Sequence, residues 1–277
     1  MRAHVIDRLQ CPNCQAPKLD LREPVFGEPN DVESGRLACE KCDSSFPIEQ
    51  GIARMLPAAT LAGNTEESEK KNRERKARDE QAEAYDRMVS LKLFSLVEIP
   101  ATLRRLRLSP QQNVVEVGCG TGRLTSVLAP KSASVIALDF SWESLVRCQA
   151  ALRLKKLNNV DLIQADATAI PLKSEIAEKT LSCQVLEHIP TPGSRSRMVS
   201  ELARIAQKDS DIVLSAYKHS LITKIFDQKE GEHPGGIYYH RFSRAELLDL
   251  LGESMEVRSM TGAMVYHYLV HAAPIQV

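Results

Sequence analysis

Short apolar runs alternate with helical stretches from about Leu91 to the end of the chain. Buried strands are predicted over 113–117, 134–138, 160–164, 180–185 and 211–215. Between them, apolar residues recur at helical spacing over 123–128, 141–157 and 197–205. This alternation is typical of a mostly parallel sheet with helices on both faces. A capping box at Ser243–Glu246 precedes one more helix, and two last strands are predicted over 255–260 and 264–270.

The pattern before Leu91 is different and divides into two zones. Residues 1–57 hold six of the fourteen prolines, which leaves little room for long helices. Residues 64–90 are dense in charges of both signs and contain no glycine or proline, which predicts a solvated helix or tether. We therefore expect a small domain over 1–57, a charged helical linker over 58–90 and the main domain over 91–277.

Composition and charge exclude several classes of protein. The 277 residues carry 36 basic and 36 acidic side chains, so no global positive field attracts nucleic acid. The longest apolar runs are well short of the roughly 20 residues of a membrane span. The first residues lack a secretory signal, and seven cysteines without one indicate a reducing compartment. We expect a cytoplasmic protein without a membrane span.

Glycines follow the first predicted strand of the main domain. Gly118, Gly120 and Gly122 allow a tight turn and bring the backbone close to a nucleotide-like ligand. Arg123 stands where a pyrophosphate-binding G-x-G-x-x-G motif has its last glycine, which disfavours a dinucleotide. Asp139 ends the next strand, 21 positions after Gly118, where a carboxylate accepts ribose hydroxyl groups.

These residues resemble the successive motifs of class I S-adenosylmethionine-dependent methyltransferases of the type 11 group. The motifs are 116–122, Asp139, 166–167 and 185–189, and the resemblance covers about 91–277. It implies a Rossmann-like, doubly wound α/β sheet of seven strands, six parallel and one antiparallel. It also implies S-adenosylmethionine as cofactor. The residues that would line its site are Glu116, Gly118, Cys119, Gly120, Gly122, Asp139, Asp166, Ala167 and Gln184.

The resemblance also implies a role for each of these positions. Glu116 and the backbone over 118–122 would hold the methionine moiety, and Asp139 would bind the ribose. Asp166 would reach the adenine amino group, the Ala167 backbone would bond an adenine ring nitrogen, and Gln184 would line the methyl-donor pocket. Because the glycine loop, Asp139 and Asp166 all fall within 113–170, we expect the donor site to be complete without the zinc-ribbon region.

A methyl acceptor that loses a proton needs a base. The candidates for the acceptor site are His188, His233, His240, Tyr238 and Tyr239. All but His188 belong to the stretch 231–242, which is predicted to be a loop over the carboxyl edge of the sheet. Two alternatives stay open: Glu187 and His188 only cap the next helix, or the stretch only closes one end of the core.

Cys11, Cys14, Cys39 and Cys42 form two C-x2-C pairs with 24 residues between them. Two such knuckles provide a closed tetrahedral site, which indicates structural Zn²⁺ in a domain too small to be stable alone. A redox dithiol and an iron–sulfur cluster are the alternatives. Residues 8–57 resemble the small zinc-binding activator subunit of several tRNA, rRNA and release-factor methyltransferases. The layout also resembles zinc-ribbon rRNA guanine-N1 methyltransferases, although their ligand set includes a histidine. The resemblance implies a module for docking a partner protein or recognising the acceptor.

We therefore predict a methyltransferase that modifies an O, N or C atom of a small molecule, such as a quinone, lipid-linked or natural-product precursor. An RNA-base methyltransferase is the alternative, favoured by the zinc ribbon and by Arg104, Arg105 and Arg107. The charge of the N-terminal region argues against this alternative, because residues 1–57 hold 7 basic and 9 acidic side chains and so lack the positive charge that binds RNA phosphates. A non-catalytic protein that holds the cofactor as a structural ligand is a third possibility.

Overall fold

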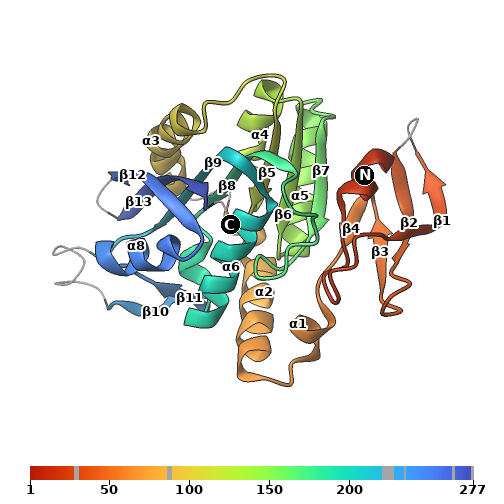
Figure 1. Ribbon diagram of the computed structural model, residues 1–277, viewed down its shortest axis with the longest axis horizontal. Helices are drawn as coiled ribbons and strands as arrows, with labels where there is room; N and C mark the ends of the chain where they lie inside the picture. Colours follow the sequence, from red (N-terminus) through yellow and green to blue (C-terminus); the bar gives the residue numbers. More distant parts are fainter. Residues whose placement is uncertain (28–30, 86–88, 220–227, 234, 264–265, 276–277) are drawn as a thin grey trace.

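A long mixed sheet organises the chain (Figure 1). The computed structural model describes every residue except 28–30, 86–88, 220–227, 234, 264–265 and 276–277. The strands of the main sheet are β1 (Asp20–Phe26), β2 (Val32–Ala38), β3 (Ser45–Glu49), β4 (Ile52–Arg54), β5 (Asn113–Val117), β6 (Ser134–Asp139), β7 (Val160–Gln164), β8 (Ala177–Cys183), β9 (Ala206–Tyr217), β12 (Met255–Ala263) and β13 (His267–Pro274). Strands β10 (Glu230–His233) and β11 (Ile237–His240) form a separate hairpin.

Helices lie on both faces of this sheet. They are α1 (Ala58–Ala62), α2 (Glu66–Tyr85), α3 (Val89–Leu106), α4 (Thr125–Leu128), α5 (Trp142–Leu154), α6 (Pro192–Ile205) and α8 (Arg244–Gly252). Short 3-10 turns are η1 (Ala3–Arg8), η2 (Ala129–Lys131) and η3 (Leu186–His188). No helix among the described residues has both the length and the apolar character that a membrane crossing requires.

Seven strands make up the predicted methyltransferase-like sheet, in the order β7-β6-β5-β8-β9-β13-β12. Strand β13 is antiparallel to both of its neighbours and the other six run parallel, as expected. The predicted strands over 113–117 and 160–164 match β5 and β7. The last expected strand began at 264, and positions 264–265 lie outside the described residues. The expected fold class is therefore confirmed.

The N-terminal residues extend this sheet instead of forming a detached unit. Strands β1 to β4 pair antiparallel in sequence order, and β4 then pairs parallel with β7 through Ala53 beside Ile163. The Met55 amide donates to the Gln164 carbonyl at 2.8 Å, and the Arg2 Nε donates to the buried Asp161 carboxylate at 2.8 Å. The two regions therefore share one eleven-stranded sheet, which the division at residue 57 did not anticipate.

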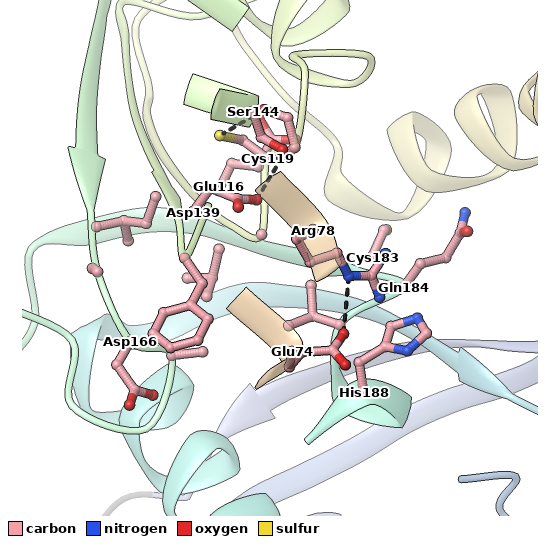
Figure 2. Close-up of a pocket in the computed structure, with 18 of the residues that line it drawn as sticks. Glu74, Arg78, Glu116, Cys119, Asp139, Ser144, Asp166, Cys183, Gln184 and His188 are labelled. Atoms are coloured by element: carbon pink, nitrogen blue, oxygen red, sulfur yellow. Dashed lines mark hydrogen bonds and ion pairs between the residues drawn. The ribbon is translucent and has the colours of Figure 1, made fainter. Parts of the chain in front are cut away.

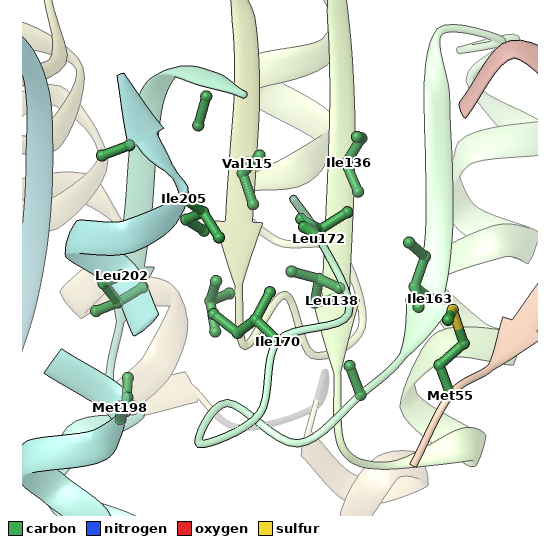
Figure 3. Packing of buried hydrophobic residues seen from close by; sticks show 14 of the residues in the cluster. Met55, Val115, Ile136, Leu138, Ile163, Ile170, Leu172, Met198, Leu202 and Ile205 are labelled. Atoms are coloured by element: carbon green, nitrogen blue, oxygen red, sulfur yellow. The ribbon is translucent and has the colours of Figure 1, made fainter. Parts of the chain in front are cut away.

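Successive side chains along each strand point to opposite faces of the sheet, so the hydrophobic core is divided into two clusters, one on each face. Val115 and Ile136 face α6 together with Leu202, whereas Val114 and Val135 face the α5 side. Figure 3 shows Met55 of the N-terminal region next to Ile163, in the same cluster as the residues under α6. Because burial of apolar surface is the main stabilising term, this shared core holds the N-terminal region to the sheet.

Candidate functional site

A cavity opens at the carboxyl ends of β5, β6, β7 and β8. Strands β6 and β7 lie on one side of β5 and β8 on the other, so the strand order reverses at β5. Such a switch point is where open α/β sheets bind ligands. About 1220 Å³ of space there is free of protein atoms, part of it open to solvent. Every candidate donor-site residue except Gly122 lines this cavity.

The glycine loop adopts a conformation that requires glycine. Gly118, Gly120 and Gly122 have φ angles of +82°, +54° and +88°. A Cβ atom on Gly118 would lie 2.0 Å from Val185 Cγ2, and one on Gly122 would lie 2.6 Å from Cys148 Sγ. The Gly118 and Cys119 amides donate to the Leu138 carbonyl at 2.7 and 2.9 Å, which fixes the loop against β6.

Two acidic side chains border this loop. Glu116 is buried and accepts a hydrogen bond from the Thr125 hydroxyl at 2.6 Å, and burial raises its pKa to about 7. Asp139 accepts from the Gly120 amide at 2.7 Å and from the Ser141 amide at 2.9 Å, one bond on each carboxylate oxygen. Burial raises the Asp139 pKa against these bonds. Each Asp139 oxygen keeps a lone pair for a ligand hydroxyl.

Asp166 lines the cavity and is already hydrogen-bonded on both carboxylate oxygens. Its Oδ1 accepts from the Thr168 amide and hydroxyl at 2.8 and 2.7 Å, and its Oδ2 accepts from the Thr60 hydroxyl at 2.8 Å and Lys71 Nζ at 2.9 Å. A carboxylate has about four acceptor positions, so these four donors saturate it. Burial opposes ionisation, but Lys71 holds the Asp166 pKa below its usual value. An adenine amino group would have to displace one of these donors.

Helix α2 forms a wall of the cavity, which the sequence analysis missed. The lining residues it contributes are Lys71, Glu74, Arg78, Gln81 and Ala82. The expected solvated tether is therefore wrong for this face, because α2 lines the same cavity as the candidate donor-site residues. The sequence did not reveal this face because α2 consists largely of charged residues, and a pattern of apolar positions places charged residues in solvent. Lys71 is buried nonetheless, because it forms an ion pair with Asp166.

The Gln184 side chain is held by a hydrogen bond to helix α3. Its Nε2 donates to the buried Glu98 of α3 at 3.0 Å, and Arg123 Nη2 donates to the same carboxylate at 2.6 Å. Gln184 also has a φ of +59°, a strained value for a residue with a side chain. Strain of this kind concentrates at ligand-binding positions, and Gln184 lines the cavity as expected.

The five acceptor-site candidates separate into two groups. His188 lines the cavity, and its ring lies 6.3 Å from that of His233, which lies 4.6 Å from the Tyr239 ring. Tyr238 and His240 face elsewhere: the Tyr238 hydroxyl bonds Glu230 at 3.0 Å, and His240 Nε2 bonds Glu246 of α8 at 2.7 Å. These two side chains hold the β10–β11 hairpin in place, and neither lines the cavity. The stretch is a hairpin instead of a loop, and position 234 lies outside the described residues.

His188 has a defined tautomer. Its Nδ1 lies 2.7 Å from the Tyr238 carbonyl oxygen, which can only accept, so Nδ1 carries the proton. Burial and the charge of Arg78 hold the His188 pKa well below its usual value. The imidazole is therefore neutral and Nε2 presents a lone pair. The adjacent Glu187 is buried without a hydrogen-bond partner in the described chain, and burial raises its pKa to about 8.

The four N-terminal cysteines converge as their spacing indicated. Their Sγ atoms all lie within 4.8 Å of one another, with Cys11 to Cys42 at 3.6 Å and Cys14 to Cys39 at 3.5 Å. In a tetrahedral zinc site with Zn–S bonds of about 2.3 Å, sulfur atoms are about 3.8 Å apart. The geometry and the donor set therefore fit a zinc ion.

In comparison with known proteins, residues 114–209 match a family model described as a methyltransferase domain. The ribosomal RNA small subunit methyltransferase A of Koribacter versatilis is 32% identical over 120 residues, or 42% of this chain and 40% of that protein. A ubiquinone biosynthesis O-methyltransferase of Aliivibrio fischeri is 26% identical over 160 residues, or 54% of this chain and 67% of that protein. The chain spans only 40–42% of the length of the first curated relatives.

Solved structures show the same fold at low sequence identity. One chain of a complex between a methyltransferase activator of Haloferax volcanii and a methyltransferase aligns with a TM-score of 0.58 and 14% identity, covering 72% of this chain and 98% of that one. A methyltransferase from Methanosarcina mazei aligns with a TM-score of 0.53 and 18% identity, covering 61% of this chain and 95% of that one. The class I methyltransferase fold is therefore confirmed.

Proposed function

We propose that this chain is an S-adenosylmethionine-dependent methyltransferase whose acceptor is a small molecule. The observation that carries the proposal is the cavity at the switch point, where the glycine loop, Glu116 and Asp139 converge. Asp139 supplies lone pairs for the two ribose hydroxyls, and Phe140 lines the adenine end beside it. The Ala167 backbone also lines that end, where an adenine ring nitrogen would bind.

We propose that the adenine amino group does not bond the Asp166 carboxylate, because Thr60, Lys71 and Thr168 already occupy its acceptor positions. In this proposal Asp166 fixes α1 and α2 over the donor cavity and shapes the adenine pocket indirectly. Gln184 and the glycine loop then border the sulfonium end of the donor.

Methyl transfer is an in-line displacement at carbon. The bond from the donor sulfur to the methyl carbon breaks as the acceptor atom bonds that carbon, so positioning supplies most of the catalysis. His188 is proposed to face the acceptor. Its Nε2 lone pair accepts the proton that a hydroxyl or N–H acceptor releases, while the Tyr238 carbonyl keeps the ring oriented.

Enclosure of the acceptor end favours a small molecule over RNA. Helix α2 covers the cavity on one side, and the Glu74 carboxylate accepts from the Tyr238 amide at 3.1 Å, which joins α2 to the β10–β11 hairpin. Residues 66–85 contain 6 basic and 7 acidic side chains, so this wall has no excess of the positive charge that phosphates attract. Several relatives act in ubiquinone biosynthesis by name, which suits a quinone-like acceptor, whereas the Koribacter relative suits RNA.

The N-terminal region is proposed to be a zinc ribbon with Cys11, Cys14, Cys39 and Cys42 as its four thiolate ligands. A closed four-thiolate site stabilises the knuckles and takes no part in chemistry. We also propose a cytoplasmic location, because thiolate ligands must stay reduced. The ribbon uses β4 to join the sheet, and its remaining surface is available to a protein partner or to the acceptor.

Transfer of a labelled methyl group tests this proposal. The protein is incubated with labelled S-adenosylmethionine and, separately, with total RNA, with cell protein and with a small-molecule extract. Label is expected in the small-molecule fraction, and it should fall sharply in a His188→Ala variant that still binds the donor. Label in RNA alone would favour an RNA acceptor, and no transfer to any fraction would leave only a cofactor-holding protein.

A further inference from the structure

Arg78 is a cation inside the donor cavity to which the sequence analysis gave no role. It lies on the face of α2 that lines the cavity, and its side chain is 25% exposed. Figure 2 shows its guanidinium beside Gln184 and His188. Its charge also affects the pKa of Asp139, Glu187 and His188, which places it near the centre of the site.

The Arg78 guanidinium is held through its Nε atom. Arg78 Nε donates to Glu74 Oε1 at 2.9 Å, and Glu74 Oε2 accepts from the Tyr238 amide at 3.1 Å. Only Nε of Arg78 is engaged in this way among the described residues, so the two terminal nitrogens stay available to a ligand. A guanidinium fixed at Nε presents these nitrogens as a pre-oriented fork, which matches the two oxygens of a carboxylate.

The other two cations of the cavity are already committed. Lys71 Nζ contacts Asp166 at 2.9 Å, Thr168 at 2.7 Å and Glu67 at 3.0 Å, which uses its three protons. Arg123 binds Glu98 at 2.6 Å and Ser95 at 3.1 Å. Arg78 is thus the cavity cation with the greatest remaining capacity for an anion.

We infer that Arg78 binds the carboxylate of the methionine moiety of the donor. This inference rests on the proposed function. S-adenosylmethionine ends in an ammonium and a carboxylate, and the cavity offers Glu116 for the first and Arg78 for the second. Because Arg78 belongs to the helix that follows the ribbon, donor binding depends on a segment outside the methyltransferase domain match at 114–209.

Calorimetric titration with two ligands tests the inference. S-adenosylmethionine and its decarboxylated form both carry the adenosine, the sulfonium and the amine, and they differ only in the carboxylate. The wild-type protein should bind S-adenosylmethionine roughly 10- to 100-fold more tightly than the decarboxylated form, the range for a charge-assisted hydrogen bond. Arg78→Met should abolish this difference by weakening S-adenosylmethionine alone, and Arg78→Lys should keep part of it.

Arg73→Met is the matched control, since Arg73 lies on the exposed side of the same helix with 70% of its side chain accessible. It should retain the full difference between the two ligands. Equal weakening of both ligands in Arg78→Met would make Arg78 a purely structural residue and overturn the inference, as would unchanged binding of both. If the wild-type protein bound neither ligand, the proposed function itself would fall, which is a distinguishable result.

Discussion

Alanine substitution at Gly118 and at Gly120 of the glycine loop should separate the cost of overpacking from the cost of a left-handed backbone. Gly118→Ala places a methyl group 2.0 Å from Val185 Cγ2 at a φ of +82°. Overpacking costs about 1–3 kcal/mol and a left-handed residue with a side chain about 1–2 kcal/mol, so we expect a loss of about 2–5 kcal/mol. Gly120→Ala has no neighbour within 4 Å of the added carbon, which leaves only the backbone cost of about 1–2 kcal/mol.

Urea unfolding followed by circular dichroism measures these differences. The double variant Gly118→Ala/Val185→Ala is the control, because removing the Val185 methyl groups relieves the clash and leaves the backbone cost. Its unfolding free energy should be compared with that of Val185→Ala alone, and the added loss should approach that of Gly120→Ala. Equal losses for Gly118→Ala and Gly120→Ala, or no relief in the double variant, would refute the packing of this loop against Val185.

Further variants test the donor site, the metal site, a buried acid and the linking helix. Asp139→Ala should weaken S-adenosylmethionine binding by about 1–3 kcal/mol in calorimetry, because two ribose hydrogen bonds are lost. Cys39→Ser should release zinc in metal analysis of the purified protein, and full retention of the ion would argue against the four-cysteine site. The raised pKa of Glu187 means that the folded state retains its proton between about pH 4.5 and 8 while the unfolded state loses it. Unfolding free energy should therefore fall as the pH rises through this window, and Glu187→Gln should flatten that slope. Deletion of residues 1–85 removes α2 and should abolish donor binding, whereas unchanged affinity would show that α2 is dispensable.

The sheet could be predicted from the sequence because its strands are short apolar runs bounded by turn residues. Strands β5 and β7 have the expected limits, and the Ser141 hydroxyl caps α5 by accepting from the Ser144 amide at 3.1 Å, as the pattern indicated. Asp139 and the glycine loop were found because their chemistry lies at fixed distances along the chain. Local sequence is informative where the structure depends on neighbouring residues.

The contacts between distant segments could not be predicted in this way. The pairing of β4 with β7 joins residues more than 100 positions apart, and no periodicity encodes it. Lys71 was assigned to solvent because a charged residue is normally exposed, yet its ion pair with Asp166 allows it to be buried. The orientations of Tyr238 and His240 depend on Glu230 and Glu246, which the spacing within the hairpin does not reveal.

Calorimetric titration of the zinc-loaded 277-residue chain with S-adenosylmethionine is the most direct test of the donor site. We expect one binding site per chain, competition by S-adenosylhomocysteine, and no comparable binding of NAD, because Arg123 stands where a pyrophosphate-binding motif has glycine. Failure to bind S-adenosylmethionine, or tighter binding of NAD, would contradict the assignment of this cavity to a methyl donor.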